Sequence, residues 1–277
     1  MGNELKQLLV HADATPQLAQ RLDFAWRLAA RHGAGVTALY ASPSASEALP
    51  VTSGMGPGLA VKRENLQDTE LARARSVFEQ LRPEGLPAAW AEIHEFPLVS
   101  AFAEQALYAD LLVLGQHGPN EGWSTLMPAD FPETVIALSG RPALVLPYTS
   151  ARPGLPGNVV IAWKPTRGAA RAVTAALPIL RQANSVQVLS WGVDAWTADG
   201  GLDIIAYLKA HGVRAAWHRT GAEPEKLGDL LLSRAFHLQA DLLVMGCYGR
   251  ARSYEWVLGG ASRTVLKSMT LPVLMAH

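Results

Sequence analysis

Blocks of apolar and polar residues along the first part of the chain predict strands and helices in alternation. Residues 5–13 (LKQLLVHAD) form a short apolar run of the kind found in a buried strand. Residues 14–33 carry apolar side chains at helical spacing, with Thr15 as the expected N-cap and Gly33 at the expected end. A second apolar run occupies residues 34–42. This order predicts a β-α-β unit.

The same blocks return in the second part of the chain, in the same order. The repeat predicts two copies of one α/β unit, because matched landmarks in a fixed order indicate a duplicated domain. The recurring landmarks are an apolar run (157–164), a helical pattern (165–184), a second apolar run (185–192), ADLLVLGQHG (109–118) echoed by ADLLVMGCYG (240–249), and GRPALVLPY (140–148) echoed by TLPVLMAH (270–277).

The repeat sets the expected domain boundaries. We predict a first domain at residues 1–150 and a second at residues 156–277, joined by the linker ARPGLPG at 151–157. The first copy is longer, and its extra residues fall near 43–67, a stretch rich in Ser, Pro and Gly that then turns polar. That composition predicts a mobile loop after the second strand of the first copy.

Glycines follow the apolar run that ends at Gly246. Gly249 completes a Gly-x-x-Gly motif, and Gly259 and Gly260 stand directly before a predicted helix, GGASRTVLKSM. Such glycines allow positive φ and a close approach of backbone to ligand. A helix N-terminus offers free N–H groups and a partial positive charge, which together suit a phosphate. The competing interpretation is that glycine serves only the geometry of the strand-to-helix turn.

Side chains near this turn fit a phosphate site as well. Ser262 could add a hydroxyl donor, and Arg250 and Arg252 could add positive charge. Trp191 ends a predicted strand at the edge where a nucleobase could lie, although burial in the core also explains it.

Charge and composition exclude several classes of partner. The chain has 24 Lys and Arg against 24 Asp and Glu, so no net charge favours nucleic acid or an anionic membrane. No apolar run of about 18 residues predicts a membrane span, and the first residues lack the pattern of a signal peptide. With a single cysteine, Cys247, the chain cannot form an internal disulfide. These features predict a cytoplasmic protein.

The sequence holds no recognised catalytic constellation. It has no Walker loop and no Gly-x-Ser-x-Gly elbow. Its eight histidines, His117 among them, form no cluster with metal-ligand spacing, so no metal site is expected. Cys247 lies between two motif glycines, where a redox role competes with a bystander role. We expect no efficient enzyme, and slow ATP hydrolysis stays open.

The spacing Gly246, Gly249, Gly259 resembles that of the universal stress protein family, and the repeat resembles a tandem member of it. The resemblance implies two open, parallel, five-stranded sheets with helices on both faces, of the adenine nucleotide alpha hydrolase-like kind. It also implies that they pack about a pseudo-twofold axis as an intramolecular pseudo-dimer, with their last strands paired antiparallel. A further homodimer is an open expectation.

For the second domain, the resemblance implies binding of ATP or another adenine nucleotide, with Mg. Two positions depart from the family pattern. Lys164 stands where an acid contacts the nucleoside, and Gly260 stands where a Ser or Thr hydroxyl contacts phosphate. The cofactor-binding residues implied are Gly246, Tyr248, Gly249, Gly259, Gly260, Ala261 and Ser262.

The first domain departs from the pattern in the opposite way. It keeps the acid as Asp13 and the first two glycines as Gly115 and Gly118, which are its implied binding residues. Where the third glycine belongs, Pro128 and its neighbours stand, and proline brings no N–H donor. We therefore expect a stress-response regulator that binds nucleotide in its second domain. The alternative is a scaffold that binds no nucleotide and acts through protein partners.

Overall fold

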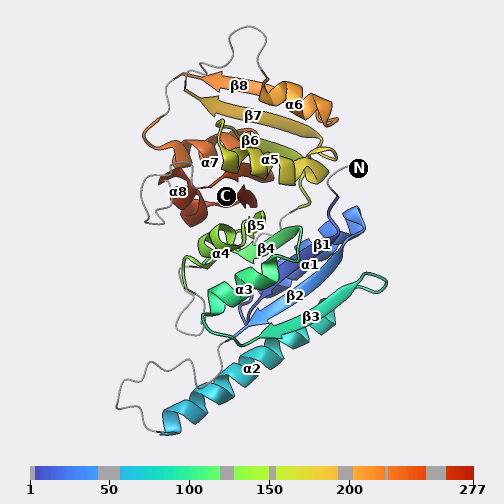
Figure 1. Cartoon of the computed structure of the whole chain (residues 1–277), viewed down its shortest axis with the longest axis vertical. Helices are drawn as coiled ribbons and strands as arrows, with labels where there is room; N and C mark the ends of the chain where they lie inside the picture. Colours follow the sequence, from blue (N-terminus) through green and yellow to red (C-terminus); the bar gives the residue numbers. More distant parts are fainter. Residues whose placement is uncertain are drawn as a thin grey trace. The chain divides into compact units, whose positions relative to one another are not determined.

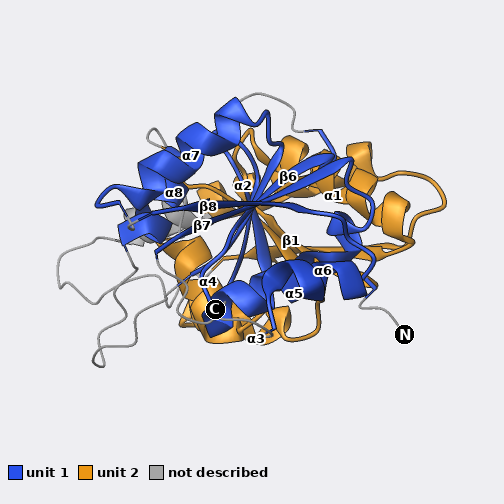
Figure 2. Ribbon diagram, turned by 90° about the horizontal axis from the view of Figure 1, so that it is seen from above, with its two compact units in different colours: residues 1–4, 142–277 blue, residues 5–141 orange. Residues whose placement is uncertain are grey.

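The structure of the chain is a computed structural model (Figure 1) that describes residues 4–42, 57–118, 128–149, 154–192, 202–221, 224–247 and 260–277. It divides into two compact units (Figure 2). We call residues 5–141 the N-terminal unit, and residues 142–277 together with residues 1–4 the C-terminal unit. No helix among the described residues is long and apolar enough to cross a bilayer.

The N-terminal unit has a parallel sheet of strand order β3-β2-β1-β4, with α1 and α2 packed together on one face and α3 and α4 on the other. Central strand β1 places Leu8 opposite Val36 of β2 and Leu111 of β4. In chain order the elements are β1 (Gln7–Ala12), α1 (Leu18–His32), β2 (Gly35–Ala41), α2 (Pro57–Leu81), β3 (Ala88–Ile93), α3 (Leu98–Ala106), β4 (Leu111–Gly115) and α4 (Phe131–Ser139).

Two local details of this unit differ from the prediction. Helix α1 starts at Leu18, so Thr15 is not its N-cap; the Thr15 hydroxyl instead donates to the Asp13 carboxylate at 2.5 Å. The helix does end at Gly33, whose φ of 63° favours glycine. Of the residues predicted as a mobile loop near 43–67, those from Pro57 onward belong to α2, and residues 43–56 lie outside the described residues.

The C-terminal unit repeats this architecture and adds one strand, giving the order β5-β10-β9-β6-β7-β8. The five strands from β10 through β9, β6 and β7 to β8 run parallel to one another. Helices α5 and α6 cover one face of this sheet, and α7 and α8 cover the other (Figure 2). Its elements are β5 (Ala143–Leu146), β6 (Asn158–Ala162), α5 (Arg167–Leu180), β7 (Ser185–Trp191), α6 (Ile204–Ala210), β8 (Ala216–Thr220), α7 (Leu227–His237), β9 (Leu242–Gly246), α8 (Gly260–Ser268) and β10 (Val273–Ala276).

Strand β5 pairs antiparallel with β10, with Val145 opposite Val273, which confirms the predicted pairing of the two closing strands. Every residue of these two strands is buried. Each half of the chain therefore contributes five strands, as predicted, while contacts assign β5 to the C-terminal unit. The predicted α/β class, with mostly parallel strands and helices on both faces, is confirmed.

Candidate functional site

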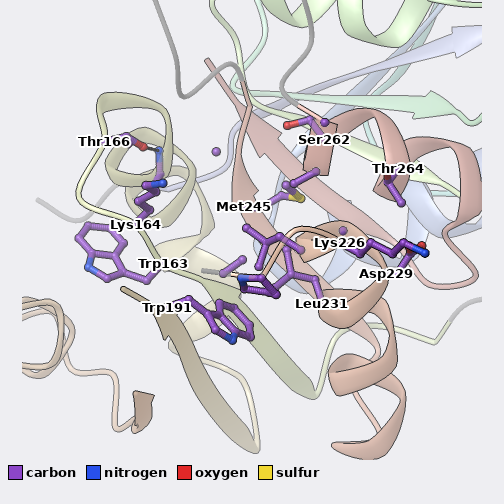
Figure 3. Close-up of a pocket in the computed structure, with 18 of the residues that line it drawn as sticks. Trp163, Lys164, Thr166, Trp191, Lys226, Asp229, Leu231, Met245, Ser262 and Thr264 are labelled. Carbon is purple, nitrogen blue, oxygen red and sulfur yellow. Dashed lines mark hydrogen bonds between the residues drawn. The ribbon is translucent and has the colours of Figure 1, made fainter. Parts of the chain in front are cut away.

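A cavity of about 650 Å³ opens in the C-terminal unit at the carboxyl ends of β6 and β9 (Figure 3). In parallel α/β sheets this edge is where ligands bind. The first turns of α5, α7 and α8 all contribute to its wall. The lining residues are Ala162, Trp163, Lys164, Thr166, Ala169, Trp191, Pro224, Glu225, Lys226, Leu227, Gly228, Asp229, Leu231, Met245, Gly246, Gly260, Ala261, Ser262 and Thr264.

Helix α8 forms the wall that the glycine motif predicted. It begins at Gly260, which confirms the expected helix, and its first turn brings Gly260, Ala261 and Ser262 to the cavity. Ser262 is only 4% exposed and lines the cavity. Ser262 and the first N–H groups of α8 are thus a set of donors suited to an anion.

The connection from β6 to α5 forms the opposite wall (Figure 3). Thr166 caps α5, because its hydroxyl oxygen accepts a hydrogen bond from the Ala169 N–H at 3.3 Å. Lys164 is exposed at the rim and brings a positive charge to the cavity. Trp163 and Trp191 add indole surface on this side of the cavity.

The start of α7 supplies charges of both signs. Glu225, Lys226 and Asp229 line the cavity, and Lys226 and Asp229 lie across it from Lys164 (Figure 3). These three residues are not among the candidates that the sequence analysis names. The Pro224 before an acidic helix start was the available signal, because Pro and acidic residues mark helix N-termini.

Gly246 lies at the cavity, but its lack of a side chain has a second explanation. A Cβ atom there would overlap the Ala169 backbone nitrogen and lie 2.9 Å from the Ala169 Cα. Gly246 is not among the glycines with positive φ, so the expectation of positive φ is wrong at this position. Gly168 is equally constrained, since its Cβ would lie 2.9 Å from the Cys247 carbonyl oxygen. Both glycines allow α5 to pack closely on the end of β9.

Several residues predicted around the glycine motif lie outside the part of the chain that the structure describes. Tyr248, Gly249, Gly259, Arg250 and Arg252 lie outside the described residues. Cys247 is described, and it is buried at 3% exposure, away from bulk solvent. Within the described part of the chain, no group of three or more His, Cys, Asp or Glu is arranged to hold a metal ion.

In the N-terminal unit, the predicted acid Asp13 is engaged by neighbouring side chains. Arg21 Nη2 lies 2.5 Å from Asp13 Oδ2, and the Thr15 N–H donates to Asp13 Oδ1 at 3.0 Å. Arg21 is itself buried, and its Nε donates to the His11 carbonyl oxygen at 3.1 Å. Burial raises the pKa of Asp13, but Arg21, His11 and Thr15 together outweigh burial and hold it below its usual value.

Arg21 also occupies the space beside the first motif glycine. A Cβ on Gly115 would lie 2.5 Å from Arg21 Nη1. His11 packs against Phe131 with ring centroids 4.5 Å apart, and burial lowers the pKa of His11 to about 4, so it is neutral at pH 7. Gly118 is buried as well, whereas Pro128 is exposed just before α4. The structure therefore places Asp13 and Gly115 together around an internal cation.

Comparison with solved structures identifies this architecture. The chain has the fold of a universal stress protein from Archaeoglobus fulgidus DSM 4304, with a TM-score of 0.67 and 15% identity over 99% of this chain and 96% of that chain. The predicted resemblance is thus confirmed at the level of fold over nearly the whole chain. A scan of protein-family models and a search of curated proteins find no match.

The same fold occurs in proteins described in other terms. A functionally unknown protein from Pseudomonas aeruginosa PAO1 matches with a TM-score of 0.61 and 15% identity, over 98% of this chain and 92% of that chain. The cytoplasmic domain of a prokaryotic cation chloride cotransporter matches with a TM-score of 0.53 and 15% identity, over 98% of this chain and 94% of that chain. Function must therefore be argued from the site.

Proposed function

We propose that this chain is a cytoplasmic, tandem universal stress protein, a stress-response regulator that binds ATP or a related adenine nucleotide in its C-terminal unit. The observation that carries the proposal is the cavity of about 650 Å³ whose wall includes the first turns of three helices. Helix N-termini attract phosphate through free N–H groups and the helix dipole. The volume falls within the range of small-molecule sites.

The side chains of the cavity suit separate parts of a nucleotide. The buried Ser262 hydroxyl and the first turn of α8 are suited to phosphate oxygens, which accept hydrogen bonds. The Trp163 and Trp191 indoles offer surfaces on which a base can stack. Glu225 and Asp229 provide carboxylate oxygens, the ligand type that Mg²⁺ prefers when it accompanies phosphate.

We assign no nucleotide to the N-terminal unit. Asp13 already accepts from Thr15 and pairs with Arg21, and Arg21 fills the space beside Gly115. A nucleoside hydroxyl would have to compete with Arg21 and Thr15 for the carboxylate oxygens. Displacing Asp13 from the pair would leave the Arg21 guanidinium, which is 3% exposed, without its counter-charge, and this is strongly unfavourable.

A protein scaffold without nucleotide is the second candidate. It is favoured by the Arg21–Asp13 pair and by Lys164, because these residues remove the usual acid contact from each half in a different way. No catalytic step is assigned, since the cavity shows no oriented nucleophile and base among its described residues.

The test is to purify the protein without added nucleotide, denature it with heat, and run the supernatant on ion exchange against ATP, ADP and AMP. We expect a nucleotide peak near one per chain. Titration calorimetry of nucleotide-free protein with MgATP then compares Ser262→Ala and Lys164→Ala with Lys209→Ala, an exposed lysine of α6 that does not line the cavity. The first two changes should weaken binding, and the third should not.

An empty supernatant together with no heat on titration would refute nucleotide binding and favour the scaffold. Phosphate release from ATP, measured in the same preparations, tests for slow hydrolysis.

A further inference from the structure

The charged side chains of the cavity in the C-terminal unit are unevenly placed around it. Both carboxylates, Glu225 and Asp229, come from the start of α7, together with Lys226. Lys164 is the one charged residue that the connection from β6 to α5 brings to the cavity, and it lies across from Lys226 and Asp229 (Figure 3). The two lysines and two carboxylates give the cavity no net charge, but the wall formed by this connection is positive.

Hydrogen bonds fix the backbone on either side of Lys164. The Trp163 N–H donates to the Leu189 carbonyl oxygen of β7 at 2.8 Å, and the Thr166 N–H donates to the Lys164 carbonyl oxygen at 2.7 Å. Thr166 is also the N-cap of α5, a helix of 14 residues, so this helix begins directly beyond the turn that holds Lys164. The partial positive charge of the α5 N-terminus therefore adds to that of Lys164 on the same wall.

Two separate walls of this cavity thus favour an anion. One is the start of α8 with Ser262, to which we assign the 5′-phosphates, and the other is the wall of Lys164. Trp163 and Trp191, to which we assign the base, lie on the same side of the cavity as Lys164 (Figure 3). The ribose joins the base to the 5′-phosphate, so it would lie between these indoles and α8, with Lys164 beside it. The ribose of ATP is uncharged, so ATP would bring no anionic group to Lys164.

We propose that the ligand is an adenine nucleotide with a second phosphate on its ribose, at the 2′ or the 3′ oxygen, and that this phosphate pairs with Lys164. This proposal rests on the proposed function for the positions of the base and the 5′-phosphate. A lysine that binds phosphate makes charge-assisted hydrogen bonds, which are stronger than those between neutral groups. The added contact should raise the affinity about tenfold or more over the same nucleotide without the ribose phosphate.

The test compares AMP, adenosine 2′,5′-bisphosphate and adenosine 3′,5′-bisphosphate by titration calorimetry of nucleotide-free protein. One of the bisphosphates should bind about tenfold or more tightly than AMP, and its identity assigns the ribose oxygen. Lys164→Met keeps much of the apolar stem without the ammonium and should remove this gain, whereas Lys164→Arg should keep most of it. Lys226→Met is the matched control, because it removes an exposed lysine on the opposite side of the same cavity, and it should keep the gain.

The outcomes separate this proposal from the proposed function. Equal affinity for AMP and both bisphosphates, in a protein that binds MgATP, would overturn the ribose phosphate alone. A gain that survives Lys164→Met, or that Lys226→Met removes equally, would also overturn it, because the second phosphate would then lie elsewhere or respond only to overall charge. A gain lost only in Lys164→Met, in a protein that does not bind MgATP, would support the ribose phosphate and refute ATP as the ligand. No binding of any of the four nucleotides would overturn both proposals.

Discussion

Replacing Arg21 with methionine should destabilise the N-terminal unit strongly. Arg21 is 3% exposed, pairs with Asp13 and donates to the His11 carbonyl oxygen. Methionine keeps much of the apolar stem but leaves the Asp13 carboxylate with only its Thr15 donors.

The magnitude follows from the burial of the pair. Removing one partner of a buried ion pair costs about 3–5 kcal/mol in the free energy of unfolding. The Asp13 side chain is 19% exposed and keeps two hydrogen bonds, so we expect the lower end, about 3 kcal/mol. Arg27→Met on the same helix is the control. Its pair with Asp23 is 30% and 25% exposed, and its loss should cost about 0.5 kcal/mol or less.

The loss of stability in Arg21→Met should become smaller as the pH falls. In the wild type, the pKa of Asp13 is held below its usual value, so the pair stabilises the fold above that value and stops doing so as the pH falls through the lowered pKa. In Arg21→Met, burial dominates and raises the pKa of Asp13. Protonation then relieves the unpaired charge, so the difference between variant and wild type should narrow as the pH falls from 7 toward 4.

Hydrogen exchange read by mass spectrometry measures this loss of stability, because peptides from β1 and β4 report the free energy of opening of the N-terminal unit by itself. A second variant, Asp13→Asn with Arg21→Met, should recover part of the loss at pH 7. The reasoning is refuted if Arg21→Met and Arg27→Met open equally easily at pH 7, or if the deficit of Arg21→Met is the same at pH 7 and pH 4.

Three further results are expected. Gly246→Ala should lower the unfolding temperature of the C-terminal unit by several degrees, because its Cβ would overlap Ala169, whereas Gly260→Ala meets nothing within 4 Å and should change it little; calorimetry of both variants checks this. The free energy of unfolding of the wild type, measured in urea, should fall by about 2 kcal/mol between pH 7 and pH 5, because the unfolded state protonates His11 before the folded state does. In His11→Phe this part of the pH dependence should be absent. The Cys247 thiol should react with Ellman's reagent slowly in native protein and rapidly in urea, and fast native reaction would contradict its burial.

The hydrophobic pattern predicted the architecture well, because strands such as β1 and β4 are buried on both faces and therefore read as continuous apolar runs. The antiparallel pairing of β5 and β10 was predicted from the family resemblance, and their apolar sequences agree with it. The start of α2 was missed because glycine and proline before residue 60 indicate a loop, whereas Pro57 stands at the first position of the helix.

The site was only partly predictable. The first turn of α8 was found from glycines before an amphipathic pattern, and it does line the cavity. The reason for Gly246 was not predictable, since it depends on how closely α5 approaches β9 in space. The pairing of Arg21 with Asp13 was also missed, although the second copy carries alanine at the corresponding position, Ala172, where it is fully buried. A lone arginine at a core position of a helix was the available signal.

The position of β5 sets how this chain can be dissected. A fragment that begins in the predicted linker, at residue 156, would lack β5 and leave β10 with an open hydrogen-bonding edge of apolar residues. Open apolar edges recruit other strands, so such a fragment would tend to associate through β10. Cutting before residue 142 keeps this edge covered. The two halves are therefore repeats in sequence, but a fragment cut at the boundary of the sequence repeat lacks a strand that the C-terminal unit needs.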